Sequence, residues 1–183
     1  MSCATRRRGS RENTTGQTIP KPKPINILHW NAEGIQNKKL AFSQRLQKED
    51  IHIACLQETH LKELQRCSVR GYQVYRQDRE GRQKGGVAIL VKNSIPAQDF
   101  TVDTNKEAEI HGVSIKVEHQ QMKIFNVYCP PDKNLSLDHM DIPEEQCLIV
   151  GDFNSHSKAW GYSEADRRGE ETEDWQIEKN LFC

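Results

Sequence analysis

The stretch C-L-I-V-G-D-F-N-S-H, residues 147–156, is the segment around which the rest of the chain is expected to be organised. Its apolar, β-branched part, Leu148 to Val150, predicts a buried strand that ends at a glycine. Asp152 and Asn154 come next, so in an extended chain they face one side while Phe153 packs the other way. A carboxylate that orients water, beside an amide that hydrogen-bonds a charged oxygen, suits metal-assisted chemistry on a phosphate. The alternative is a strand followed by an Asx turn.

Length and composition indicate one polar domain with a sizeable core. The chain has 183 residues, 35% of them hydrophobic, and a mean hydropathy of −0.82. It contains no apolar run near the ~18 residues of a membrane helix, and no apolar segment follows the basic N-terminus. The six cysteines form no C-x-x-C pair, which indicates reduced thiols and argues against zinc. We therefore expect an intracellular monomer, nuclear or cytoplasmic, without a signal peptide, a transmembrane segment or a membrane partner.

Charge is distributed unevenly although the net charge is zero. Residues 1–24 carry six basic side chains and one acidic one, a net charge of +5. The Arg6-Arg7-Arg8 block lies among polar residues and predicts a disordered basic tail that contacts nucleic acid or acts as a nuclear address. A solvated tail without a partner is the alternative. The proline-rich run 20–24 is a stiff spacer, so the folded domain is expected to be residues 25–183.

Hydrophobic periodicity predicts a mixed α/β fold with many strands. A strand–helix–strand order at the start implies a parallel crossover, and a strand pair further along implies an antiparallel hairpin. In the first helix, Leu40 and Leu46 are expected to lie on related faces, and in the second Thr172 is expected to be the N-cap. The predicted strands are 25–30, 51–56, 71–75, 86–91, 110–117, 122–128 and 147–150, and the predicted helices are 36–50 and 172–181.

Several of these strands end in similar chemistry. Asn31 follows the first strand, Glu58 the second, Tyr128 the hairpin strand and Asp152 the last. Four such exits indicate a site at one edge of a pair of sheets. Each residue also has a structural interpretation: a turn amide, a solvated acid, a half-buried aromatic or an Asx-turn residue.

The chemistry of the exits fits phosphodiester hydrolysis, in which positioning and charge stabilisation carry most of the catalysis. The Glu58 carboxylate suits Mg²⁺, which takes few protein ligands and keeps several waters. Asn31 and Glu33 are expected near the same ion or the phosphate. The Tyr128 hydroxyl is a donor for a phosphate oxygen.

Five ordered motifs make the chain resemble a known family. The chain resembles the endonuclease/exonuclease/phosphatase superfamily and, within it, the endonuclease domain of jockey-like non-LTR retrotransposon polyproteins. S-H-S-K-A-W-G-Y at 155–162 and D-R-R-G at 166–169 match the narrower group. The five motifs are H-W-N-A-E-G at 29–34, L-Q-E-T-H-L at 56–61, G-G-V-A-I-L-V at 85–91, N-V-Y-C-P-P at 126–131 and G-D-F-N-S-H at 151–156.

The resemblance implies a four-layer α/β sandwich, two packed mixed β-sheets flanked by helices. It implies a metal-dependent nuclease that nicks a DNA substrate so that a 3′ hydroxyl primes reverse transcription, with Mg²⁺ or, in its place, Mn²⁺. His156 is expected to be local structure near the site. The resemblance assigns the metal to Glu58 and Asn31, the phosphate contact to Tyr128, and the nucleophilic water to Asp152 with Asn154 beside it.

One part of the family pattern has no counterpart in the sequence. The superfamily pattern ends with a Ser-Asp-His motif after a last strand, and no histidine here follows His156. We therefore expect a C-terminally truncated domain that lacks its last strands, with weak stability and little or no nuclease activity. The alternative function is a catalytically dead retroelement remnant, at most a weak nucleic-acid binder. A phosphatase or lipid phosphodiesterase of the same superfamily is a third reading.

Overall fold

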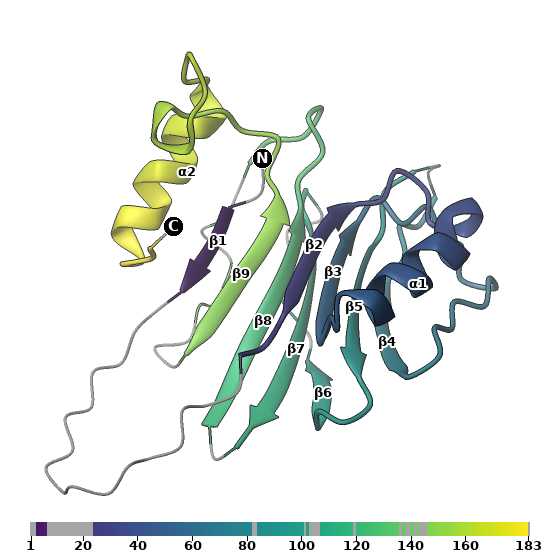
Figure 1. The fold of residues 1–183 in the computed structure, drawn as a ribbon. Helices are drawn as coiled ribbons and strands as arrows, with labels where there is room; N and C mark the ends of the chain where they lie inside the picture. Colours follow the sequence, from purple (N-terminus) through teal and green to yellow (C-terminus); the bar gives the residue numbers. More distant parts are fainter. Residues whose placement is uncertain are drawn as a thin grey trace, which may run out of the picture.

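Two mixed β-sheets pack face to face, with one long helix on the outer side of each (Figure 1). The predicted four-layer α/β sandwich is confirmed. A computed structural model of the chain describes residues 3–6, 24–81, 84–100, 102, 107–118, 120–135, 137, 140, 142 and 146–182.

The strand order gives each sheet one parallel pair. The first sheet has the order β2-β3-β5-β4, in which only β2 and β3 are parallel. The second has the order β1-β9-β8-β7-β6, in which only β8 and β9 are parallel. The strands are β1 (Cys3–Arg6), β2 (Ile27–Asn31), β3 (Ile53–Gln57), β4 (Tyr72–Gln77), β5 (Val87–Lys92), β6 (Ala97–Phe100), β7 (Glu109–Val117), β8 (Gln120–Tyr128) and β9 (Cys147–Asp152).

Strand β3 shows how alternation builds the layers. All five of its residues are buried. Ile53 and Cys55 face the other sheet, whereas Ala54 and Leu56 face helix α1 (Lys39–Lys48). Because successive side chains of a strand point to opposite faces, one short apolar run serves two cores. The apolar pattern therefore fixes β3 in the middle of the molecule.

Helix α1 buries a face that differs from the predicted one. Phe42 and Leu46, four residues apart, pack on the sheet, whereas the Leu40 side chain is 75% exposed. Spacing explains the difference, since residues four apart share a helix face and residues six apart do not. The strand–helix–strand crossover itself is confirmed, because β2 and β3 are parallel.

Helix α2 (Arg167–Glu178) begins five residues before the predicted start. The expected N-cap, Thr172, lies inside the helix and donates its hydroxyl to the Arg168 carbonyl at 2.7 Å. The actual cap is Asp166, whose carboxylate accepts from Gly169 N at 2.7 Å. Threonine can bond back to its own helix, so its presence does not mark a helix start.

Besides β1, two short elements were not predicted. Strand β6 has four residues and only partial burial, which gives a weak alternation signal at a sheet edge. The 3₁₀ turn η2 (Lys158–Trp160) is capped by Ser157, whose hydroxyl accepts from Ala159 N. A second 3₁₀ turn, η1 (Gln36–Lys38), leads into α1 within the predicted first helix.

The predicted disordered tail, residues 1–24, differs from the structure at Cys3–Arg6. These residues form β1, which pairs antiparallel with the edge of β9 from Gly151 to Leu148. An open strand edge offers unpaired backbone groups to any extended segment, which explains why a polar tail can add a strand there. Residues 1, 2 and 7–23 lie outside the described residues, so the division into tail and domain stays a prediction.

Candidate active site

Four predicted site residues lie at one edge of the sandwich because both parallel strand pairs end there. Asn31 is paired with Gln57 at the end of β2 and β3, and Glu58 follows directly. Tyr128 is paired with Asp152 at the end of β8 and β9. The carboxyl ends of parallel strands meet at one edge of a sheet, and here the two sheets bring their edges together (Figure 1).

A single amide joins acids from the two sheets. Asn31 Nδ2 donates to Glu58 Oε1 at 2.9 Å and to Asp152 Oδ2 at 2.8 Å. Its oxygen, Oδ1, accepts from the backbone N–H of Glu33 at 3.2 Å. These contacts fix the orientation of the Asn31 amide, since a reversed amide would place its oxygen against two carboxylates.

Glu58 is held as an anion by three hydrogen-bond donors. Burial raises its pKa, but hydrogen bonds from Asn31, His60 and Tyr128 outweigh that effect and the pKa is below its ordinary value. His60 Nε2 lies 3.3 Å from Glu58 Oε2. Burial and the neighbouring Glu58 carboxylate raise the pKa of Tyr128. At neutral pH the site therefore combines a carboxylate with a protonated phenol that can donate.

The loops behind Glu58 are tied together through their backbones. Gly34 N donates to the Glu58 carbonyl at 2.8 Å, and His60 N donates to the Gly85 carbonyl at 2.8 Å. Gly86 has a φ of +84° and lies so close to Thr59 that a Cβ there would come within 2.6 Å of Oγ1. The glycines of the H-W-N-A-E-G and G-G-V-A-I-L-V motifs thus permit the close packing that positions Glu58.

Glu58 itself has a strained backbone. Its φ is +48°, in the left-handed region that non-glycine residues seldom adopt. Asn154 has the same feature, with a φ of +47°. Such conformations persist only where the surroundings enforce them, and they are concentrated at functional sites.

Asp152 and Asn154 form a turn at the end of β9. Asp152 Oδ1 accepts from Asn154 N at 3.1 Å, which is the Asx turn given above as the alternative. The Asn154 side chain bends back, so that Nδ2 donates to the Cys129 carbonyl at 3.0 Å. Phe153 points into the core between the sheet and α2, as predicted. The Asx turn is thus present, and the other oxygen of Asp152, Oδ2, accepts from Asn31.

Two residues near the site were not predicted from the sequence. His60 contacts Glu58 as described above. The Arg79 guanidinium lies over the Tyr128 ring, 5.6 Å from its centroid, and forms an ion pair with Glu109. A charged loop after β4 was the only sequence signal for Arg79, since its contact with Tyr128 depends on the packing of the two sheets.

Two other residues lie apart from this cluster. The Glu33 side chain is exposed, and within the described part of the chain its carboxylate has no hydrogen bond or ion pair. His156 is also exposed, with Nδ1 3.0 Å from Asp166 Oδ2 and its ring 4.4 Å from that of Tyr162. The structure thus brings neither the Glu33 carboxylate nor His156 into contact with Glu58 or Asp152.

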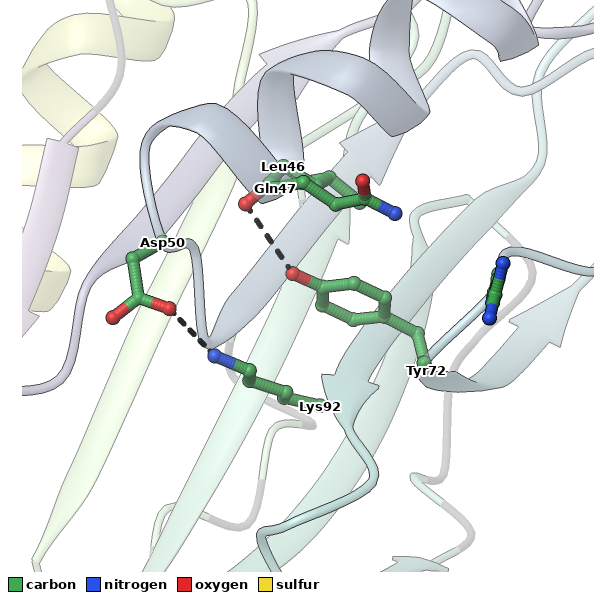
Figure 2. A pocket seen from close by; sticks show the side chains of 7 residues that line it. Leu46, Gln47, Asp50, Tyr72 and Lys92 are labelled. Carbon is green, nitrogen blue, oxygen red and sulfur yellow. Dashed lines mark hydrogen bonds and ion pairs between the residues drawn. The ribbon is translucent and has the colours of Figure 1, made fainter.

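A separate pocket of about 370 Å³ lies at the opposite end of the β2–β3–β5–β4 sheet. Asp50 precedes β3 and Lys92 ends β5, whereas Glu58 follows β3. Figure 2 shows Lys92 paired with Asp50, at 2.5 Å, and the Tyr72 hydroxyl reaching the Leu46 carbonyl. Because it lies at the far end of these strands, this pocket does not belong to the strand-exit cluster.

The donors at the strand exits fit a hard divalent cation. Carboxylate oxygens of Glu58 and Asp152 both accept hydrogen bonds from the Asn31 amide nitrogen. A cation between the two acids would be attracted by the same two oxygens. Mg²⁺ commonly binds through one or two carboxylates and keeps its waters, so it does not need a third acidic ligand. Among the described residues, no group of three His, Cys, Asp or Glu side chains is arranged to hold a metal ion.

Sequence comparison gives a family for the chain. A model of the Endonuclease/Exonuclease/phosphatase family matches residues 28–181. The probable RNA-directed DNA polymerase from transposon X-element of Drosophila melanogaster is 30% identical over 152 residues, which are 80% of this chain and 17% of that protein. The RNA-directed DNA polymerase from mobile element jockey of Drosophila melanogaster is 24% identical over 150 residues, 79% of this chain and 16% of that protein. The chain thus spans about a sixth of these relatives.

Comparison of structures gives the same fold. The endonuclease domain of TRAS1, a telomere-specific non-LTR retrotransposon, superposes with a TM-score of 0.71 at 22% identity, covering 85% of this chain and 70% of that one. An AP endonuclease from Archaeoglobus fulgidus gives a TM-score of 0.57 at 16% identity, covering 83% of this chain and 71% of that one. Among the described residues, no helix has the length and apolarity to cross a membrane. With the family model matching residues 28–181, the chain belongs to the endonuclease/exonuclease/phosphatase family.

Proposed function

We propose that this chain is a DNA-nicking endonuclease domain of a non-LTR retrotransposon, which hydrolyses a phosphodiester bond with Mg²⁺ or Mn²⁺. The supporting observation is the Asn31 amide that joins Glu58 of one sheet to Asp152 of the other. The relatives named as retrotransposon polymerases, and the similarity to the TRAS1 endonuclease domain, support DNA as the substrate.

Each residue has a role that follows from its chemistry. Glu58 would hold the cation, which supplies Lewis acidity toward a phosphate oxygen. Asn31 would join it through Oδ1 once its amide turns, because Nδ2 lies between the two acids in this structure. The Tyr128 phenol, which is bonded to Glu58 in this structure, would turn its one proton to a phosphate oxygen when substrate binds, because its raised pKa keeps it protonated. Asp152 orients a water and accepts its proton, with Asn154 beside it as a donor to developing negative charge. The nick leaves a 3′ hydroxyl from which reverse transcription is primed.

Substitution of Glu58 tests this proposal. With Mg²⁺ we expect the chain to convert supercoiled plasmid to the nicked form only slowly, as the sequence predicts, and Glu58→Gln to lower this rate at least ~100-fold because the charge that holds the cation is lost. The control is Glu63→Gln, which removes a charge from an exposed side chain in the same segment. A nick that a DNA polymerase can extend would establish the 3′ hydroxyl.

Three outcomes would contradict the proposal or redirect it. Equal nicking by Glu58→Gln and Glu63→Gln would exclude Glu58 as the metal-binding acid. If the unsubstituted chain does not nick DNA, but it and Glu58→Gln bind DNA equally well, the non-catalytic nucleic-acid binder is favoured. Hydrolysis of p-nitrophenyl phosphate or a phosphoinositide without nicking would favour the phosphatase or lipid phosphodiesterase branch.

A further inference from the structure

Arg168, in the first turn of α2, donates to four backbone carbonyls. Its Nη1 reaches the carbonyls of Pro130 at 2.9 Å and Lys133 at 3.1 Å. Its Nη2 reaches the carbonyls of Cys129 at 3.2 Å and Phe153 at 2.6 Å. Within the described part of the chain, Arg168 has no carboxylate within 4.0 Å, so its charge acts on these four carbonyl dipoles.

These carbonyls belong to the two segments that carry candidate site residues. Cys129 directly follows Tyr128, and Phe153 lies between Asp152 and Asn154. The Cys129 carbonyl accepts from both Arg168 Nη2 and Asn154 Nδ2. One guanidinium therefore fixes the end of β8 relative to the end of β9, and with it the rotamer of Asn154.

The first turn of α2 is built so that Arg168 can reach this position. Asp166 caps the helix and also accepts from His156 N at 3.2 Å, which anchors the turn to the chain after β9. Gly169 lies directly on this segment, since a Cβ there would come within 1.7 Å of the His156 carbonyl oxygen. The D-R-R-G motif thus places a helix against two strand exits at a distance that only glycine permits.

We propose that Arg168 is a positioning residue of the candidate site, which holds Tyr128 and Asn154 in register through the backbone carbonyls of the two strand exits. Arginine suits this role because its planar, five-donor fork can serve several acceptors at once, whereas lysine is a point charge. The catalytic consequence rests on the proposed nuclease function, but the structural consequence does not.

The neighbouring Arg167 provides a matched control. Its side chain is 90% exposed and pairs with Glu171 within the same helix. In the full chain we expect Arg168→Ala to lower kcat for plasmid nicking ~10- to 100-fold with KM changed less than ~3-fold, because displacement of a catalytic group by about an ångström costs up to this much. Arg167→Ala should leave both constants within ~2-fold. Millimolar guanidinium chloride, compared with NaCl at the same ionic strength, should raise kcat of Arg168→Ala toward the unsubstituted value and should not change kcat of Arg167→Ala.

A second measurement does not require activity. In ¹⁵N–¹H spectra of the full chain, Arg168→Ala should shift the Asn154 side-chain amide and the backbone amides of Phe153 and Asn154, whereas Arg167→Ala should not. Arg168→Lys keeps the charge and the stem, so it should fold but show the same shifts. If the unsubstituted chain does not nick DNA, the proposed function fails, and the spectra alone decide the positioning role.

The positioning role is overturned by any of three results. In the first, folded Arg168→Ala has an unchanged Asn154 side-chain resonance. In the second, an active chain loses kcat no more with Arg168→Ala than with Arg167→Ala. In the third, both Arg168→Ala and Arg168→Lys unfold, which would make Arg168 a general stability residue.

Discussion

At the scale of single residues, the Asn31 amide nitrogen donates to carboxylates that come from different sheets. Two acids that converge on one point repel each other, and a shared donor offsets part of that repulsion. The same residue is anchored on its oxygen side by Glu33 N, so it cannot rotate away without breaking three hydrogen bonds. The position of each acid therefore depends on this amide.

Removal of the amide should disable the site while leaving the fold intact. For Asn31→Ala we expect plasmid nicking to fall ~10- to 100-fold, the range found when a group that orients a metal-binding acid is lost. The circular dichroism spectrum should be unchanged. Asn37→Ala, at an exposed position in η1, is the control. Equal nicking by the two variants would show that the bridge is not required.

A buried thiol gives a second prediction at this scale. Cys55 lies between the sheets, and burial raises its pKa to about 12. Because the thiolate is the reactive form, Cys55 should resist alkylation by iodoacetamide in the folded chain at pH 8 and react only after unfolding in urea. Mass spectrometry of the Cys55 peptide measures this. Rapid modification under native conditions would contradict the intersheet position.

At the scale of elements, α2 shows how a cap connects a helix to a site. Asp166 accepts from Gly169 N and His156 N, and it lies next to the His156 ring. Its limited burial raises its pKa, but the two backbone hydrogen bonds and the nearby His156 and Arg168 outweigh that effect, so the pKa is below its ordinary value of 3.8. The cap is therefore strongest when it is ionised.

The Asp166 cap predicts a pH dependence with a definite sign. A carboxyl whose pKa is lower in the folded state stabilises the fold above its unfolded pKa, and the effect is lost as pH falls through the folded pKa. An asparagine side chain at this position would still cap the helix, so Asp166→Asn isolates the charge. The difference in free energy of unfolding between wild type and Asp166→Asn should be smaller at pH 3 than at pH 5, because the Asp166 carboxyl takes up its proton as pH falls through this range. Urea titrations at the two pH values measure it, and an equal or larger difference at pH 3 would contradict the assignment.

Replacement of the cap by alanine should cost more than replacement by asparagine. Asp166→Ala removes the acceptor for two backbone N–H groups, so we expect a loss of ~1 kcal/mol in the free energy of unfolding at pH 7. The comparison is with Glu170→Ala, in the first turn of the same helix at an exposed position. Equal losses in the two variants would show that Asp166 acts only through its general charge near the helix N-terminus.

At the scale of the whole molecule, a buried amide pair joins the two sheets. Asn126 of β8 donates to the Leu56 carbonyl at 2.8 Å and the Ala88 carbonyl at 2.9 Å, and accepts from Gln57. Asn126 and Gln57 are both fully buried. Such a pair is costly to bury but specifies one alignment of the two sheets, because a shifted sheet would leave several polar groups unpaired.

The intersheet amide should therefore be essential for stability. Asn126→Ala leaves Leu56 O, Ala88 O and Gln57 Nε2 without that partner, and we expect a loss of about 2–4 kcal/mol in the free energy of unfolding. Gln121→Ala, an exposed position on the same strand, should change it by less than ~0.5 kcal/mol. Urea denaturation, monitored by tryptophan fluorescence, measures the free energy of unfolding of both variants. A loss below ~1 kcal/mol for Asn126→Ala would contradict the linking role.

The sequence predicts which segments form strands, and which polar residues follow them, better than it predicts where each helix begins. The apolar runs of β3, β5, β8 and β9 were recognised because burial on both faces leaves few polar residues in them. The sequence pattern predicts that α2 starts at Thr172, whereas its N-cap is Asp166. Both residue types cap helices, and only the packing of the first turn against residue 156 selects Asp166. Leu40 was likewise assigned to the buried face that Phe42 occupies.

By itself, the sequence determined which residues end the strands and what chemistry they carry. Asn31, Glu58, Tyr128 and Asp152 follow apolar runs, and that pattern can be read locally. Only the tertiary structure decided that Asn31 bonds both acids, that Arg79 lies over Tyr128, and that Arg168 spans four carbonyls. These contacts join residues 15 to 121 positions apart, whose meeting depends on how two sheets and a helix pack. Strand periodicity is a property of neighbours along the chain, whereas the site is a property of neighbours in space.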